Sequence, residues 1–177
     1  MLFRSTLDHA QLSVRAKAAS VTTSSQPPVI KVRNLQRKIP VNVTALQNLA
    51  ARAVRRCLQL HKRRRTELSK LHEVFVWLIS DRRMSWLHRK FLGEEGTTDV
   101  LTFQHGEIFI SVETAKRNAR IFATSLIREL ELYIVHGLLH LHEFDDRTPA
   151  EARKMKRAQE KILGDCSGSQ IAAAGLN

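Results

Sequence analysis

Residues Glu73 to Ser80 read EVFVWLIS, a run dense in β-branched and aromatic side chains that predicts a buried β-strand. Further along the chain, Val100 to Phe103 and Glu107 to Val112 predict two more strands. The intervening Gln104-His105-Gly106 indicates a hairpin between them. A short β-rich run at Val29 to Val32 adds another strand, so we expect a small mixed sheet of about four strands.

Segments before, between and after these strands carry the patterns of helices, which are expected to pack against the sheet. The first helix is expected over about 44–60, and Asp81 is expected to cap a second helix that ends near Phe91 or Leu92. Three more helices are expected over about 113–122, 124–142 and 149–163. This order of elements predicts an α/β (α+β) fold with helices packed against the sheet.

The stretch from His136 to Asp146 reads HGLLHLHEFDD and carries the candidate metal site. His136 and His140 are four positions apart, so on a helix both imidazoles lie on one face and can bind one ion. His142 falls about 200° around the helix from His140, on the far side. Asp146 follows His140 at the spacing of the third ligand in the extended zinc-protease motif. Three protein ligands leave a fourth position for water, as in catalytic zinc sites.

Gly137 follows His136 at the position where a helical zinc protease carries its glutamate base. Peptide hydrolysis by that mechanism therefore loses support. A metal-dependent hydrolase of another substrate class, such as a minimal protease, stays as a weaker alternative.

The HGLLHLHEFDD stretch resembles the hallmark H-G-x-L-H-L-x-G-Y-D-H of the YbeY endoribonuclease family, the ribosomal RNA maturation factors. GTTDVLTF at 96–103 resembles the family's P-T-D-V-L-S-F, and GEIFISVETA at 106–115 resembles its G-D-I-x-I-S. VIKVRNLQRKIP resembles the first strand and linker of the family. The similarity covers about residues 29–163.

The resemblance implies a metal-dependent endoribonuclease that uses one Zn²⁺ ion and acts on single strands in ribosomal RNA processing and ribosome quality control. It implies ribosomal RNA and the small ribosomal subunit as partners. The three motif histidines that bind the metal in the family fall here on His136, His140 and Asp146. In the mechanism that we expect, the ion activates a water and stabilises negative charge on the scissile phosphate.

The chain departs from the family pattern at three positions. Asp146 replaces the third histidine, and Glu143 replaces a glycine where a backbone turn would favour Gly. Leu92, in Phe91-Leu92-Gly93, replaces an arginine that is proposed to handle RNA. Arg89 or Lys90 are candidates to substitute for it. These departures leave a non-catalytic, ribosome-associated RNA-binding protein with a structural metal as the alternative function.

The formal charge of +12, from 29 basic and 17 acidic residues, favours polyanionic partners such as RNA, although plain solubility also explains it. The predicted first helix and the loop after it concentrate candidate phosphate contacts at Arg52, Arg55, Arg56, Arg63, Arg64 and Arg65. Asp99, with Thr98, is a candidate to support catalysis from the floor of the cleft or, alternatively, to cap a strand.

The expected domain spans residues 29–164 and is flanked by a disordered or targeting-like extension at 1–28 and a flexible tail at 165–177. No apolar run approaches the roughly 20 residues that span a bilayer. No expected helix pairs a broad apolar face with a basic one well enough for membrane-surface binding. We therefore expect a cytoplasmic protein without a membrane partner, or an organellar one if residues 1–28 are a transit peptide. Cys57 and Cys166 form no CxxC pair and are expected to be reduced.

Overall fold

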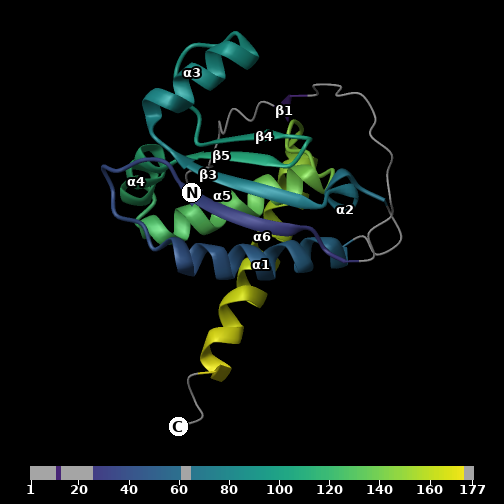
Figure 1. The fold of residues 1–177 in the computed structure, drawn as a ribbon. Coiled ribbons are helices and arrows are strands. Elements are labelled where there is room, and N and C mark those ends of the chain that lie inside the picture. Colours follow the sequence, from purple (N-terminus) through teal and green to yellow (C-terminus); the bar gives the residue numbers. More distant parts are fainter. Residues whose placement is uncertain (1–10, 13–25, 61–64, 174–177) are drawn as a thin grey trace.

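The computed structural model describes residues 11–12, 26–60 and 65–173 of the chain, and it has the predicted α/β fold (Figure 1). A mixed sheet of β2, β3, β4 and β5 packs against helices, and the short β1 extends the sheet at β4. The strands are β1 (Gln11–Leu12), β2 (Val29–Asn34), β3 (Glu73–Ile79), β4 (Val100–Phe103) and β5 (Glu107–Ser111). The helices are α1 (Val43–Leu60), α2 (Glu67–Lys70), α3 (Asp81–Leu92), α4 (Val112–Ile121), α5 (Leu126–Leu141) and α6 (Pro149–Ala173).

The strands lie in the order β1-β4-β5-β3-β2, and β4 and β5 form the predicted antiparallel hairpin. β3 pairs in parallel with both β2 and β5. The hairpin requires glycine at Gly106, which has φ 101°. A Cβ atom at this position would lie 2.8 Å from the carbonyl oxygen of Glu73. The tight turn therefore lets the hairpin lie directly beside the start of β3.

One face of the sheet forms the main hydrophobic core beneath α1 and α5. Val74, Val76 and Leu78 of β3 are fully buried on this face, whereas Phe75 and Trp77 alternate with them and are half-buried. The prediction of a wholly buried strand at 73–80 was therefore wrong for the second face. Aromatic side chains make that face apolar without a helix burying it completely, so the run lacks the polar alternation of a half-exposed strand.

A side chain of α1 forms hydrogen bonds with the backbone at the outer edge of β2. Gln47 Oε1 accepts a hydrogen bond from the backbone N–H of Val32 at 2.8 Å, and Gln47 Nε2 donates to the carbonyl of Ile30 at 2.8 Å. Both backbone groups point away from β3, so α1 satisfies groups that would otherwise be open at the sheet edge.

Two helix ends differ from the sequence-based expectation. Ser80, not Asp81, is the N-cap of α3, because Asp81 instead accepts hydrogen bonds from Ser111 and Thr114 and pairs with Arg117. Helix α6 continues to Ala173, beyond the predicted end near 163. Leu163 and Cys166 are buried against the core, so tertiary packing carries the helix past the expected stop at Gly164.

No helix in residues 26–60 or 65–173 is long and apolar enough to cross a membrane.

Candidate metal centre

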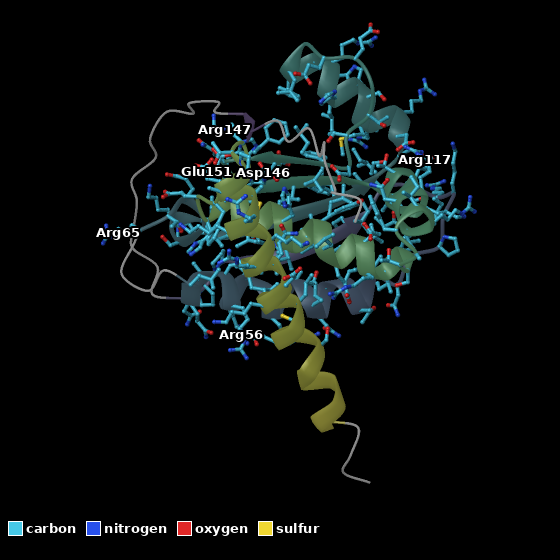
Figure 2. All side chains as sticks on the ribbon, turned by 180° about the vertical axis from the view of Figure 1, so that it is seen from behind. Arg56, Arg65, Arg117, Asp146, Arg147 and Glu151 are labelled. Carbon is cyan, nitrogen blue, oxygen red and sulfur yellow. The ribbon has the colours of Figure 1, made fainter. Side chains whose placement is uncertain are left out.

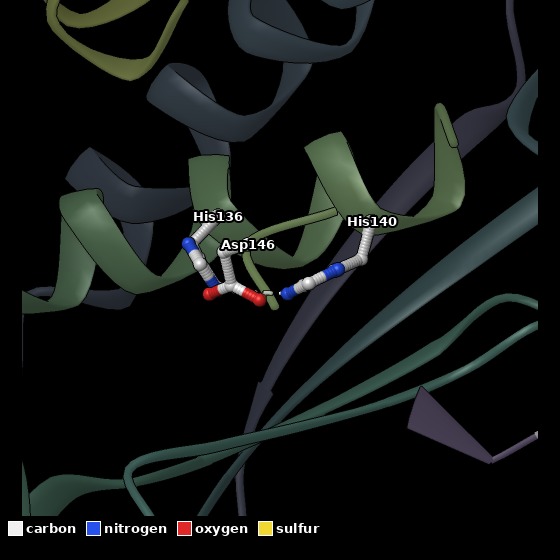
Figure 3. A group of neighbouring side chains, drawn as sticks. All are labelled: His136, His140 and Asp146. Atoms are coloured by element: carbon white, nitrogen blue, oxygen red, sulfur yellow. Dashed lines mark hydrogen bonds and ion pairs between the residues drawn. The ribbon is translucent and has the colours of Figure 1, made fainter. Parts of the chain in front are cut away.

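Helix α5 places His136 and His140 one turn apart and directs both rings to one point (Figure 3). Their Nε2 atoms are 2.9 Å apart, and the two residues are only 3% and 6% exposed. For comparison, two nitrogens bound to one tetrahedral zinc at about 2.0–2.1 Å would lie about 3.3 Å apart. The helical spacing thus produces the predicted pair of converging imidazoles.

Gly137 lets α5 approach the sheet closely beside this pair. A Cβ atom at Gly137 would lie 2.7 Å from Cγ2 of Ile108 in β5, too close for any side chain without a shift of the strand or the helix. The position that carries the general base in helical zinc proteases therefore faces the core here, which further disfavours the protease alternative.

Asp146 reaches the histidines because the chain reverses after α5. Its Oδ2 atom is 3.8 Å from His136 Nε2, and the potential ligand atoms of His136, His140 and Asp146 all lie within 4.8 Å of one another. Figure 3 shows the Asp146 carboxylate turned towards both rings. This group of side chains could hold a metal ion, as the spacing in the sequence predicted.

The other nitrogen of each imidazole faces an oxygen acceptor. His136 Nδ1 lies 3.1 Å from Oε1 of Gln159 in α6, and His140 Nδ1 lies 3.2 Å from the carbonyl oxygen of Phe144. A carbonyl accepts but cannot donate, so the hydrogen on His140 belongs on Nδ1. The Gln159 oxygen can accept a hydrogen bond from His136 Nδ1 in the same way. Hydrogens on both Nδ1 atoms would leave both Nε2 atoms as potential metal ligands beside the Asp146 carboxylate.

The reversal of the chain depends on an unusual backbone at Glu143, which has φ 64°. The sequence-based expectation that a turn here would favour glycine is therefore confirmed. Asp145 fixes the next residues, because its Oδ1 accepts hydrogen bonds from the backbone N–H groups of Asp146 and Arg147. The hydrogen bond from Arg147 and the backbone N–H groups hold the pKa of Asp145 below its usual value.

Replacing Glu143 with glycine should raise the free energy of unfolding by about 0.5–1 kcal/mol, because glycine removes the Cβ strain of the left-handed backbone. Urea denaturation measures this change. Glu143→Ala is the matched control, since it removes the same side chain but keeps the strain, and it should give no comparable gain. Equal gains in both variants would show that the side chain, not the backbone, is unfavourable.

His142 is outside the group of potential metal ligands, as the sequence predicted. It is buried, its Nδ1 atom lies 2.8 Å from Thr66 Oγ1, and its ring stacks on Phe144. It thus links the C-terminal end of α5 to the start of α2.

Asp99 caps a strand, which is one of the two roles that the sequence indicated for it. Its Oδ1 accepts a hydrogen bond from the backbone N–H of Val100 at 2.9 Å at the start of β4. Asp99 also lies near Tyr133, where burial and the Asp99 charge raise the pKa of the tyrosine. Asp99 is outside the group of potential ligands around His136. A supporting role for it in catalysis stays a prediction.

The candidate arginines are spread over several surfaces. Arg56 pairs with Asp165 of α6 at 3.9 Å and lies apart from Asp146 in Figure 2. Arg52 is half-buried and close to Cys166. Burial raises the pKa of the Cys166 thiol, and the nearby Arg52 charge offsets only part of this increase. Arg55 and Arg65 are exposed, and Arg63 and Arg64 lie outside the described residues. The described members of this set are therefore not all gathered around the candidate metal centre, and the RNA-binding role of the set stays a prediction.

Arg89 and Lys90 occupy the exposed last turn of α3, which projects from the body of the protein in Figure 1. The ammonium group of Lys90 lies 4.6 Å from the centroid of the Trp86 ring and 5.6 Å from that of Phe91. Lys90 is thus held by aromatic rings of α3.

Sequence reasoning missed the groups that orient the imidazoles. Gln159 follows His136 by a long stretch of chain, and nothing in the helical pattern of α6 marks it as a partner. The Phe144 contact uses a backbone carbonyl, which leaves no signal in side-chain patterns.

The family model described as "Endoribonuclease YbeY" matches residues 31–167, which include most of β2, all of β3, β4 and β5, and the whole candidate metal centre. The chain belongs to the YbeY family. A protein named "Endoribonuclease YbeY" from Anaeromyxobacter sp. is 37% identical over 100 residues, covering 51% of this chain and 52% of that protein. The Frankia alni protein of the same name is 32% identical over 129 residues, covering 62% of this chain and 71% of that protein. The chain thus spans 52% of the first relative's length.

The fold agrees with that of a solved structure. The solution structure of TM1509 from Thermotoga maritima matches with a TM-score of 0.54 and 27% sequence identity. The match covers 79% of this chain and 93% of that one, so the shared fold includes nearly all of the smaller protein.

Proposed function

We propose that this chain is a zinc-dependent, single-strand-directed endoribonuclease that acts in ribosomal RNA maturation and ribosome quality control. The observation that carries the proposal is the convergence of two imidazole Nε2 atoms and a carboxylate in a YbeY family chain. Relatives named "Endoribonuclease YbeY" support the reaction class. The partner that we propose is the RNA of the small ribosomal subunit, in the cytoplasm or in an organelle.

In the proposed site, His136, His140 and Asp146 hold the ion, because imidazole and carboxylate are ordinary zinc ligands and three of them leave a position open. A bound zinc ion supplies positive charge for a phosphodiester and lowers the pKa of water. Gln159 and the Phe144 carbonyl orient the rings so that Nε2 of each faces the site. The net charge of +12 draws RNA towards the protein.

The test measures metal content and cleavage of a single-stranded RNA on the same preparations of the wild-type chain, His140→Ala and Asp165→Asn. We expect about one zinc per wild-type chain and cleavage that EDTA abolishes and zinc restores. His140→Ala should lose both properties. Asp165→Asn, which changes an exposed carboxylate paired with Arg56, is the control and should keep both. A carefully prepared wild-type chain without metal would contradict the proposed site.

A second candidate is a non-catalytic RNA-binding protein whose metal only stabilises the fold. Leu92 favours it, because this residue replaces the family's arginine and packs against the buried apolar cluster that contains Met84 and Phe103. Stoichiometric metal and tight RNA binding without cleavage would select this candidate over the nuclease.

A further inference from the structure

The sheet face opposite α5 carries a connected row of aromatic side chains. The rings of Phe75 and Trp77 stack with centroids 5.4 Å apart, and Trp77 stacks on Phe109 at 6.4 Å. Phe109 meets Phe103 edge-on at 5.7 Å, and Phe103 meets Phe91 of α3 edge-on at 5.1 Å. We call these five residues the aromatic strip. It crosses β3, β5 and β4 and ends on α3.

Four rings of the aromatic strip remain accessible in the part of the chain that the structure describes, whereas Phe103 is only 3% exposed and supports them from below. Helices α1 and α5 pack on the other face of the sheet, and α3 covers only one end of the strip's face (Figure 1). Phe75, Trp77 and Phe109 are half-buried, and Phe91 is 39% exposed. Trp86, next to Phe91 on α3, is 48% exposed. A contiguous group of large apolar side chains on a solvated surface commonly marks a binding site.

A lysine ammonium group lies over each end of the strip. Lys31 of β2 is 5.2 Å from the centroid of Phe75, and Lys90 is 5.6 Å from that of Phe91. Arg33 is exposed on the same face of β2 as Lys31. Two carboxylates also lie here: Glu73 pairs with Lys31, and Glu107 accepts a hydrogen bond from Trp77 Nε1 at 3.1 Å. The cations are therefore concentrated at the ends of the strip, and its centre consists of partly exposed aromatic rings.

We propose that the aromatic strip binds single-stranded RNA by stacking bases on its rings while Lys31, Arg33 and Lys90 contact phosphates. This deepens the proposed function, from which it takes RNA as the partner. Exposed rings flanked by cations are how proteins hold single strands with little sequence preference, because every base has a face that can stack. The net charge of +12 agrees with a polyanionic partner and disfavours a basic protein segment.

The strip and the metal centre lie on opposite faces of the sheet, because α5 packs on the face that buries Ile108. The strip therefore holds RNA away from the reacting phosphodiester. Removing one of its rings should raise KM for RNA and leave kcat unchanged, since the lost contact is the same in the ground state and the transition state.

The experiment measures binding of a fluorescein-labelled, unstructured RNA oligonucleotide by anisotropy in EDTA, which prevents metal-dependent cleavage. Phe75→Leu and Phe91→Leu keep an apolar side chain but remove a ring, and each should weaken binding about 5-fold or more. Phe122→Leu is the matched control, because Phe122 is also 39% exposed but lies outside the strip at the end of α4. It should bind RNA as the wild type does. Thermal unfolding shows that the variants are folded.

The two tryptophans of the chain, Trp77 and Trp86, allow a direct readout. In the Trp86→Phe variant, Trp77 is the fluorophore, and the RNA should quench it whereas polyphosphate, which has no bases, should not. Iodide should also quench Trp77 in the free protein. Failure of iodide to reach Trp77 would overturn the proposal, because another part of the chain or a second copy would then cover the strip.

The outcomes separate this proposal from the proposed function. Equal RNA binding by Phe75→Leu, Phe91→Leu and Phe122→Leu, with cleavage intact, overturns the strip and leaves the nuclease standing. Weaker binding in the first two variants, in a chain that cleaves no RNA, supports the strip and contradicts the nuclease.

Discussion

Asp146→Ala should lower zinc affinity by roughly 100-fold or more and abolish RNA cleavage. Loss of a group that merely orients a ligand costs about 10–100-fold in affinity, and Asp146 is itself a proposed ligand. The carboxylate also supplies the negative charge beside two neutral imidazoles. Competition with a fluorescent zinc chelator measures the affinity, and gel analysis of a single-stranded RNA measures the cleavage.

Asp146→His is the informative partner of this variant, because it restores the third histidine of the YbeY hallmark. We expect it to keep zinc bound and to cleave RNA at least as well as the wild type, since imidazole binds zinc at a distance similar to that of a carboxylate. Unchanged zinc affinity in Asp146→Ala would show that the ion does not use this residue and that the two histidines suffice.

Gln159→Leu should weaken zinc binding by about 10–100-fold without removing any ligand. Leucine has nearly the same size but cannot accept the hydrogen bond that orients the His136 ring from Nδ1. Gln159→Glu should bind zinc more tightly than Gln159→Leu, because a carboxylate in this position makes the imidazole more basic.

The same zinc competition assay checks this second prediction, and Glu160→Ala, an exposed neighbour on α6, is its control. Equal affinities in Gln159→Leu and the wild type would mean that the Gln159 contact does not position His136. Loss of affinity in the control as well would point to a general effect on α6.

The sequence predicted the parts of the fold that local pattern controls. The β4–β5 hairpin follows from two short apolar runs around Gly106, and the convergence of the two candidate ligand histidines follows from a four-residue spacing on a helix. Asp146 was predicted from its spacing to His140 and from its place in the family hallmark, and the turn at Glu143 was predicted from the glycine that it replaces.

Contacts between distant segments were beyond such reasoning. The burial of Cys166 extends α6, the amide of Gln47 closes β2, and Gln159 orients His136, and each depends on which elements meet in space. The aromatic strip was missed for a related reason. In EVFVWLIS both sets of alternating residues are apolar, so periodicity could not distinguish a strand buried on both faces from one with an aromatic open face.

The Gln47 side chain has a consequence for how these molecules meet in concentrated solution. A strand from a second molecule that approaches β2 would need the Val32 N–H and the Ile30 carbonyl, and the Gln47 amide already occupies both. Edge-to-edge association is a common first step in the aggregation of β-sheets. In this chain, a side chain of the helix that packs against the core also blocks that step, because Gln47 must release both backbone groups before β2 can pair with another strand.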